Sequence, residues 1–415
     1  MPQATKTDAE SQSIYRFWSN RRVSSEQIYQ SHRDGVVQRA KDCQTVLAIQ
    51  DTTDFVFANR PQTEGLGFIN QTTKQGFKVH SCLAVSGAGE PLGVLHQQSW
   101  IREQRSGKKG QRKQLPIEQK ESYRWLTTLS AVEAAMPESV PLVHIGDREA
   151  DIFELFTQPQ ARQSELLIRA EHNRKVQHEL GHLLPTIEQA PVMGEMTLEL
   201  KRNPKRPART AQVSIQAMQV TLEVPYRKEP RGLQPVTINV ILVAETSAPE
   251  GDTPVRWLLL TTLPIETFEQ VWQCVIWYSY RWLIERFHFT LKSGCRFEEL
   301  QLHSRVRLVK ALATYNIVAW RLMWLLYQAR TQPEVSCQVV LEPHEWRLLR
   351  RRFEPKNRSR KPPTLRQALC WMAQLGGFRA RKGDGEPGLK TLWRGITKFY
   401  ALLEGAQLAS DTYVP

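Results

Sequence analysis

The spacing of hydrophobic residues changes along the chain between the period of a strand and the period of a helix, and these changes divide the chain into segments. Apolar and polar residues alternate with the period of a strand in TVLAIQDTTDFVF (residues 45–57), and the same pattern returns at residues 78–86 and 92–100. A helical pattern follows at residues 117–136, and VPLVHIG (residues 140–146) has the apolar character of a short buried strand. Strands followed by alternating helices and strands predict an α/β fold with a mixed sheet.

The pattern changes twice in the second half of the chain. Residues 172–262 alternate strongly and carry no helix signal, which predicts an antiparallel β insertion. Helical periodicity returns at residues 266–330, and the tail combines a basic stretch at 350–363 with helical pieces at 364–376 and 389–409. We therefore divide the chain into five segments: 1–40, polar and helical; 41–171, the first part of the α/β core; 172–262, the β insertion; 263–330, the second part of the core; and 331–415, a helical C-terminal region.

Charge narrows the range of partners. Lysine and arginine outnumber aspartate and glutamate by 56 to 42, which gives a net charge of +14 and a pI near 9.6. This excess favours a polyanionic partner, nucleic acid or an acidic membrane surface, and a basic protein without such a partner is the alternative. The sequence has no run of about 18 apolar residues, so we expect no membrane-spanning helix. The polar N-terminus has no signal-peptide core, and the six cysteines lack CxxC spacing, so we expect a cytoplasmic protein without a zinc site or a disulfide framework.

One predicted helix, YSYRWLIERFHFTLK (residues 278–292), reserves a line of polar positions among large apolar residues. At about 100° per residue, Tyr278, Arg281, Glu285 and Lys292 fall within roughly 60° of one another. The helix therefore presents a phenol, an anion and two cations on one face.

Carboxylates suited to hard cations occur at two predicted strand ends. Asp51 follows VLAIQ, and Asp147 follows VHIG. With Glu285 they make three carboxylates from separate segments, which is the set that a two-metal phosphoryl-transfer site needs. Each has an ordinary alternative: a turn aspartate for Asp51, a helix N-cap for Asp147 and an i,i+4 pair with Arg281 for Glu285.

The spacing Tyr278–x2–Arg281–x3–Glu285–x6–Lys292 resembles the YREK signature of DDE transposases of the insertion-sequence-four type. Further segments resemble that family in the family's order: YRFWSNRRVSSEQI, LAIQDTTDF, GDREADIFELF, KRPART, RWLLLTTLPIE and MAQLGGF. The resemblance implies an RNase H-like catalytic core interrupted by the β insertion. It also implies that Asp51, Asp147 and Glu285 bind two divalent ions, Mg²⁺ with Mn²⁺ as a substitute, for cleavage at transposon ends and strand transfer into target DNA.

The resemblance assigns further residues to DNA. Tyr278, Arg281 and Lys292 would contact phosphates beside the cleavage point. His288, beside the site, is a further candidate for DNA contact, and both a catalytic role and a packing or orienting role stay open for it. Because the family excises its element through a DNA hairpin, Trp257 and Trp282 would hold a flipped base, although Trp257 is also consistent with a strand core residue. Basic residues at 105–113, together with Arg206 and Arg209, would neutralise phosphates, with a solvated basic loop as the alternative. For the basic residues within 350–361, two alternatives stay open: contact with DNA, or a linker.

The partners implied are double-stranded DNA, at the transposon ends and the target, and a second copy of the chain in a synaptic homodimer formed by the C-terminal helices. The corresponding location is the bacterial cytoplasm, in association with the nucleoid.

The chain departs from the family at two places. A lysine is expected where this chain has Phe289, and the family's N-terminal end-recognition domain is mostly absent, because the matching segments begin only near Tyr15. Residues 1–40 would then be a remnant of that domain. Two rival functions stay open: an N-terminally shortened inhibitor that dimerises with a longer form, and an RNase H-like nuclease without strand transfer.

Overall fold

The structure, a computed structural model, describes residues 8–57, 62–69, 74–102, 115–157, 164–200, 208–226, 232–381 and 383–412. In chain order, the elements of the first half are α1 (Asp8–Ser19), α2 (Ser25–Ala40), β1 (Val46–Val56), β2 (Gly67–Phe68), β3 (Gln75–Ser86), β4 (Pro91–Trp100), η2 (Ile117–Gln119), α3 (Tyr123–Ala135), β5 (Leu142–Gly146), η3 (Arg148–Ala150), α4 (Phe153–Thr157), β6 (Ser164–Arg169) and α5 (Leu183–Glu188). They are followed by β7 (Val192–Leu200), β8 (Arg209–Leu222), β9 (Val236–Glu245), β10 (Arg256–Thr261), α6 (Phe268–Ser279), α7 (Trp282–Phe289), η5 (Thr290–Gly294), η6 (Phe297–Glu299), α8 (Arg305–Thr331), η7 (Cys337–Val339), α9 (Pro343–Phe353), α10 (Leu365–Leu375) and α11 (Leu389–Thr412).

All of the described strands belong to one mixed sheet, which includes the strands predicted as a β insertion domain. The strand order is β2-β3-β1-β5-β6-β10-β9-β8-β7, and β4 also pairs with β3. Strands β1, β5 and β6 run parallel to one another, whereas β3 and β10 are antiparallel to their neighbours within this group. The parallel strands therefore end at a common edge of the sheet, where loop residues from separate segments can meet.

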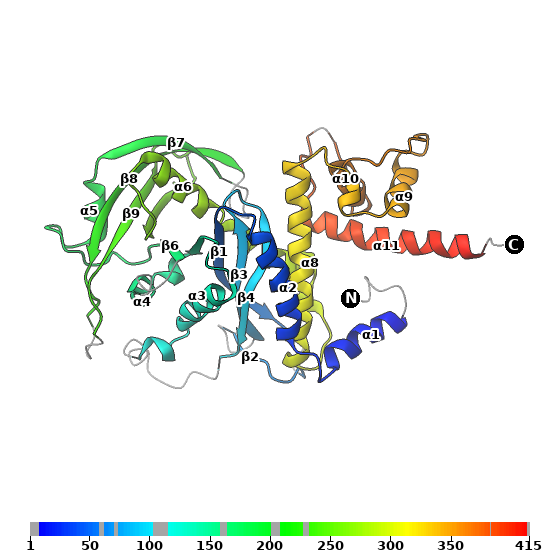
Figure 1. The fold of residues 1–415 in the computed structure, drawn as a ribbon, viewed down its shortest axis with the longest axis horizontal. Coiled ribbons are helices and arrows are strands. Elements are labelled where there is room, and N and C mark those ends of the chain that lie inside the picture. Colours follow the sequence, from blue (N-terminus) through cyan, green and yellow to red (C-terminus); the bar gives the residue numbers. More distant parts are fainter. Residues whose placement is uncertain are drawn as a thin grey trace.

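Both faces of the central strands are buried, which explains their apolar sequences. Along β1, Leu47 and Ile49 belong to a large core cluster that also includes residues of α6, α7 and α8. Ala48 on the opposite face packs in a second cluster with residues of α2 and α3. Alternate side chains of β1 thus belong to different core clusters, each shared with helices. The arrangement of these helices around the sheet can be followed in Figure 1.

The block at 172–262 contains the predicted antiparallel strands, and these strands extend the same sheet. β10 pairs with β6, and β9, β8 and β7 follow in antiparallel order. The expectation that the block has no helix is wrong, because α5 lies within it. Its residues Leu183 and Ile187 are buried against the sheet, so two apolar contacts stabilise a helix too short to give a clear periodic signal.

The C-terminal region is helical and lies beyond α8. In Figure 1, the 27-residue helix α8 stands between the sheet and the elements α9, α10 and α11. The basic stretch predicted at 350–363 begins inside α9, because Trp346 and Leu349 on the inner side of this helix are buried and hold its last turn in place.

Within the described part of the chain, no helix combines the length and the apolar composition required to cross a bilayer.

Candidate active site

Two of the predicted carboxylates meet at the common edge of the parallel strands. β1 and β5 pair in register from Val46 with Leu142 to Ile49 with Ile145, so two further residues along each strand bring Asp51 level with Asp147. The prediction that Asp51 ends its strand is wrong. β1 continues to Val56 because β3 pairs with it over its whole length, while β5 stops at Gly146. Asp51 therefore lies in a strand that has lost one neighbour, which opens its side chain toward Asp147.

A tight turn fixes the position of Asp147. The side chain of Asp147 accepts a hydrogen bond of 2.9 Å from the backbone N–H of Glu149 and caps the short helix η3, so the predicted capping role is confirmed. Gly146 makes the turn possible, since a Cβ at this position would lie 2.4 Å from the Cβ of Ala150. The cap leaves the second carboxylate oxygen of Asp147 outside this hydrogen bond.

The helix predicted for residues 278–292 is three pieces. α6 ends at Ser279, i→i+3 hydrogen bonds such as the one from Arg281 to the carbonyl of Tyr278 make a tight turn, and α7 runs on into the π-helical turn η5. The prediction of a single straight polar face is therefore wrong. The apolar residues Ile284 and Phe287, both fully buried, hold α7 against the sheet, and Glu285 one turn after Arg281 forms an ion pair with it.

The third carboxylate, Glu285, is close enough to affect the pKa of Asp51. Burial and the carboxylate of Asp147 raise the pKa of Asp51 to about 7; Glu285 adds to this shift, whereas Arg281 and the N–H of Thr52 oppose it. Asp147 and Glu285 thus both act on Asp51. In the structure Glu285 turns to Arg281, and no group of three or more His, Cys, Asp or Glu side chains in the described ranges is placed to hold a metal ion.

His288 lies beneath this site. Its ring is 6% exposed, and its Nδ1 is 3.8 Å from an Asp51 carboxylate oxygen. Burial, with a smaller effect of Lys292, lowers the pKa of His288 to about 3, so the ring is neutral at physiological pH. A buried ring 3.8 Å from Asp51 is consistent with the orienting role.

Three predicted DNA contacts lie around the carboxylates. Tyr278 is 3% exposed, its hydroxyl is buried without a hydrogen bond of normal geometry, and burial raises its pKa while the nearby guanidinium groups of Arg281 and Arg169 oppose the shift. Trp257 on β10 packs edge-on against Tyr278 with ring centroids 5.1 Å apart, so the structure brings these two together. Trp257 and Trp282 are both half-buried, and the packing of Trp257 agrees with its alternative as a core residue.

Lys292 approaches the site from the π-helical turn. Its ammonium lies 5.6 Å from the ring centroid of Phe55, and burial lowers its pKa while Glu298, Asp54 and Asp51 act in the opposite direction. It also lines a polar cleft of about 310 Å³ beside the carboxylates. The cleft joins residues of β1, β3, β4, α3, η3 and η5 with two residues of the intervening loops: Thr52, Thr53, Asp54, Lys78, Trp100, Arg102, Glu121, Arg124, Glu149 and Lys292.

Arg124 is a residue of this site that the sequence does not reveal. From α3 it donates a hydrogen bond of 2.9 Å to Thr52 Oγ1, next to Asp51, and it forms an ion pair with Glu149, two residues after Asp147. Its side chain is 11% exposed. One guanidinium therefore connects the two backbone segments that carry the aspartates, and only the pairing of distant segments identifies it.

A row of buried polar groups continues from Arg124 under β1. Thr52 contacts His80, His80 contacts Gln50, and Gln50 contacts His144, with separations between 2.9 and 3.1 Å. Burial lowers the pKa of His80 well below its ordinary value, so its ring is neutral. Hydrogen bonds in this buried row resist displacement of the strand that bears Asp51.

Two arginines of the β insertion were predicted to bind DNA, and the structure describes one of them, Arg209. Arg206 and the basic segment at 105–113 lie outside the described residues. Arg209 pairs with Glu245, whose side chain is fully buried, and with Asp252 at 2.8 Å. Its guanidinium is thus committed to two carboxylates within the chain, and the prediction of a phosphate contact is not supported.

Replacing Arg209 by methionine is expected to lower the midpoint of thermal unfolding, because Glu245 would be left buried without its cation. The dissociation constant for duplex DNA should stay within roughly twofold of the unchanged protein, since no phosphate contact is lost. Arg256→Met is the matched control: its pair with Glu188 is about half exposed on both sides and should contribute little. An unchanged unfolding midpoint with weakened, less salt-dependent DNA binding would restore the DNA role.

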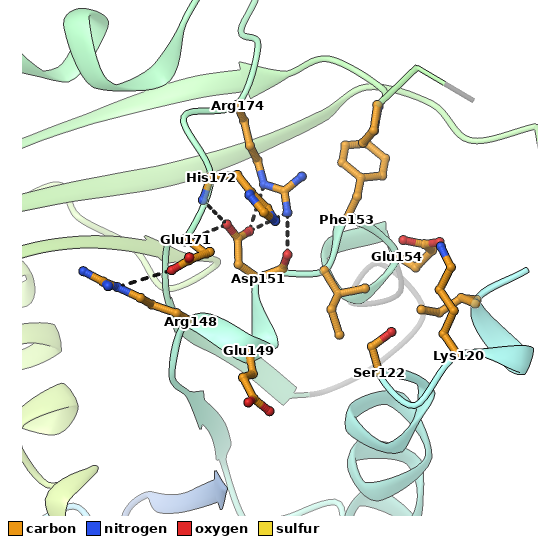
Figure 2. Close-up of a pocket in the computed structure, with 13 residues that line it drawn as sticks. Lys120, Ser122, Arg148, Glu149, Asp151, Phe153, Glu154, Glu171, His172 and Arg174 are labelled. Carbon is orange, nitrogen blue, oxygen red and sulfur yellow. Dashed lines mark hydrogen bonds and ion pairs between the residues drawn. The ribbon is translucent and has the colours of Figure 1, made fainter. Parts of the chain in front are cut away.

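A larger cavity of about 590 Å³ opens on the other side of the Asp147 turn. Figure 2 shows Asp151 at its wall, between Arg174 and the backbone of residues 171 and 172. The side chain of Asp151 is fully buried and that of Arg174 is 8% exposed. This buried pair fixes the segment that follows η3, and through it the turn that presents Asp147.

Comparison with known proteins identifies one region of the chain. Residues 317–414 match the family described as the transposase Tn5 dimerisation domain. Among solved structures, a piggyBac transposase synaptic complex with hairpin DNA is similar over 86% of this chain, with 10% sequence identity and a TM-score of 0.34. This chain spans 57% of that protein's length. The chain thus has a large mixed α/β sheet followed by a helical region that is similar to a transposase dimerisation domain.

Proposed function

We propose that the protein is a DDE-type DNA transposase of the insertion-sequence-four type with an RNase H-like core. It would cleave DNA at the ends of a transposon, excise the element through a DNA hairpin and join it to target DNA. The observation that carries the proposal is the register of β1 and β5, which places Asp51 level with Asp147, together with the electrostatic effect of Asp147 and of Glu285 from α7 on Asp51.

Three further features support this function. The net charge of +14 suits a polyanionic substrate. Lys292 lines a polar cleft beside the carboxylates, and the half-buried Trp257 packs against Tyr278. The match of residues 317–414 to a transposase dimerisation domain supports a homodimer.

The donor set fits Mg²⁺, because three carboxylates offer only oxygen ligands and their mutual repulsion favours a bound cation. Asp51, Asp147 and Glu285 would hold the ions, and Mn²⁺ would substitute for Mg²⁺. When bound, two such ions activate the attacking hydroxyl and stabilise the leaving oxygen at phosphorus. For Glu285 to take part, its carboxylate must leave Arg281, which frees the guanidinium.

Several residues around the carboxylates would then hold the scissile strand, each by a different contact. The freed guanidinium of Arg281 can bind a phosphate in a bidentate manner, and Lys292 adds a second cation on the cleft side. Tyr278 carries a buried hydroxyl without a partner and stands against Trp257. Arg124 keeps the segments of Asp51 and Asp147 in register, and the neutral His288 supports Asp51 from below.

The test uses a supercoiled plasmid that carries the gene with its own flanking DNA, incubated with purified protein and Mg²⁺ or Mn²⁺. We expect cuts at the element boundaries with hairpinned ends, followed by joining to target DNA. Glu285→Gln should abolish the cuts, because an amide cannot replace a carboxylate ligand.

Other outcomes would separate the rival functions. Metal-dependent nicking that Glu285→Gln abolishes, without joining of a 3′-hydroxyl end, would indicate a nuclease. Absence of any metal-dependent cleavage, combined with inhibition of a longer transposase form added to the same reaction, would indicate the inhibitor.

A further inference from the structure

The C-terminal region carries a dense group of cations that the active site does not use. They occupy the last turn of α9 and the loop after it: Arg351, Arg352, Lys356, Arg358, Arg360 and Lys361, here called the α9 basic patch. All six are exposed, and none forms an ion pair with a carboxylate in the part of the chain that the structure describes. Such a concentration of unpaired positive charge repels itself, so it favours a polyanion at this surface.

The one carboxylate within the stretch is already engaged. Between Trp346 and Gly383 the sequence contains no acidic residue except Glu354. Glu354 is half-buried and accepts hydrogen bonds from Asn357 at 2.8 Å and from Gln367 of α10 at 2.9 Å. Its charge is therefore directed into the loop and toward α10, and the outer surface of the patch remains positive.

The loop is held in a defined shape, which distinguishes it from a flexible linker. Arg350 is buried, lies 5.0 Å from the ring centroid of Trp346 and donates a hydrogen bond to the carbonyl of Ser359. The backbone N–H of Ser359 is in turn bonded to Asn357 at 3.0 Å. These contacts fold the loop back on α9 and bring the exposed cations of helix and loop together.

Helix capping alone does not explain the patch. Cations in the last turn of a helix stabilise its C-terminal carbonyls, and this accounts for Arg351 and Arg352. The effect falls off within one turn, so it does not extend to Arg358, Arg360 and Lys361 in the loop.

The patch also does not suit a two-fold dimer interface. A symmetric interface centred on this surface would place it against its own copy, and like charges would face each other. The patch lies beyond α8 from the sheet that carries Asp51 (Figure 1), so it is also remote from the carboxylates.

We propose that the α9 basic patch binds the phosphate backbone of duplex DNA at a second site, away from the cleavage edge and without sequence preference. The inference rests on the proposed function for the identity of the polyanion. Of the two alternatives for residues 350–361, contact with DNA or a linker, the inference selects contact with DNA.

The test measures binding of the full-length protein to duplex DNA by fluorescence anisotropy over a series of salt concentrations, with EDTA to prevent cleavage. The patch variant is Arg351→Gln, Arg352→Gln, Lys356→Gln and Arg358→Gln together. Each phosphate contact contributes about 0.9 to the slope of log K against log salt. We therefore expect the slope to fall by roughly 3 to 4 and the affinity to fall at least about tenfold near 0.1 M salt.

A matched control removes the same charge from dispersed exposed positions: Arg16→Gln, Lys41→Gln, Lys175→Gln and Lys390→Gln. Its slope should change by less than about 1. A charge-conserving variant, Arg351→Lys with Arg352→Lys and Arg358→Lys, should keep the slope of the unchanged protein and shows whether the patch residues are needed for folding. Equal losses in the patch variant and the dispersed control, or an unchanged slope in the patch variant, would overturn the inference.

Two further measurements separate this inference from its alternatives. Binding to vesicles of phosphatidylserine and phosphatidylcholine that is tighter than binding to DNA, and lost in the patch variant, would assign the patch to a membrane surface and overturn the DNA assignment. The plasmid cleavage assay is read independently. If the unchanged protein fails to cleave but the patch variant shows the reduced slope, the proposed function fails and the second DNA site stands.

Discussion

Replacing Asp51 by asparagine is expected to stabilise the metal-free protein at neutral pH while abolishing its metal-dependent cleavage of DNA. Burial and the carboxylate of Asp147 raise the pKa of Asp51 to about 7, so its ionised form is disfavoured in the folded chain. Asparagine has a similar shape and cannot ionise. As a ligand it replaces a carboxylate by a neutral amide, and we expect cleavage to fall by at least about 10³-fold.

The direction of the pH dependence follows from the raised pKa. In the unfolded chain Asp51 ionises near its ordinary value of 3.8, whereas in the folded chain it keeps its proton to about pH 7. Between these values the folded state binds more protons, so stability is fully present at low pH and decreases as the pH rises toward 7. Each pH unit corresponds to about 1.4 kcal/mol, which gives roughly 4 kcal/mol over the interval.

The measurement is the midpoint of thermal unfolding in EDTA at pH 5 and pH 8 for both proteins. The unchanged protein should lose more stability than Asp51→Asn between the two values. Asp54→Asn is a control on the same strand, since Asp54 is paired with Lys78 and does not contribute to the pKa shift of Asp51. An equal pH dependence of the unchanged protein and Asp51→Asn would contradict the convergence of the carboxylates.

Replacing Asp151 by alanine is expected to lower the free energy of unfolding by about 3–5 kcal/mol. The fully buried carboxylate accepts hydrogen bonds of 2.8 and 2.9 Å from the backbone N–H groups of Glu171 and His172, and it pairs with Arg174 (Figure 2). Alanine would leave a buried guanidinium without its anion and two N–H groups without an acceptor. The measurement is urea unfolding followed by circular dichroism.

The neighbouring pair of Arg148 and Glu171 provides the control. Its side chains are 57% and 47% exposed and its atoms are 3.5 Å apart, so Arg148→Ala should cost less than about 1 kcal/mol. Because Asp151 closes the segment after Asp147, Asp151→Ala should also weaken cleavage at temperatures where the protein is still folded. Equal effects of the two substitutions on stability would show that water reaches the Asp151 pair.

The acidic residues proposed for the site could be singled out from the sequence, but their surroundings could not. Asp51 and Asp147 follow apolar runs whose strand character is local, and Glu285 lies in a helix with a clear apolar side. The ion pair of Arg209 with Glu245 joins residues 36 positions apart, and the bond of Arg124 to Thr52 joins residues 72 apart. No local pattern contains such pairs, so one arginine was assigned to DNA and the other was missed.

The sequence by itself determined the types and order of most elements, the mixed sheet and the positions of the carboxylates, because strand and helix periods depend on residues close together in the chain. The tertiary structure decided how these elements end and what each charge contacts. β1 continues past Asp51 because β3 pairs with it there, and the predicted polar helix breaks at Arg281 and turns into a π-helix at Thr290. The physical reason is that strand pairing, helix distortion and buried ion pairs are set by partners that only the folded chain brings together.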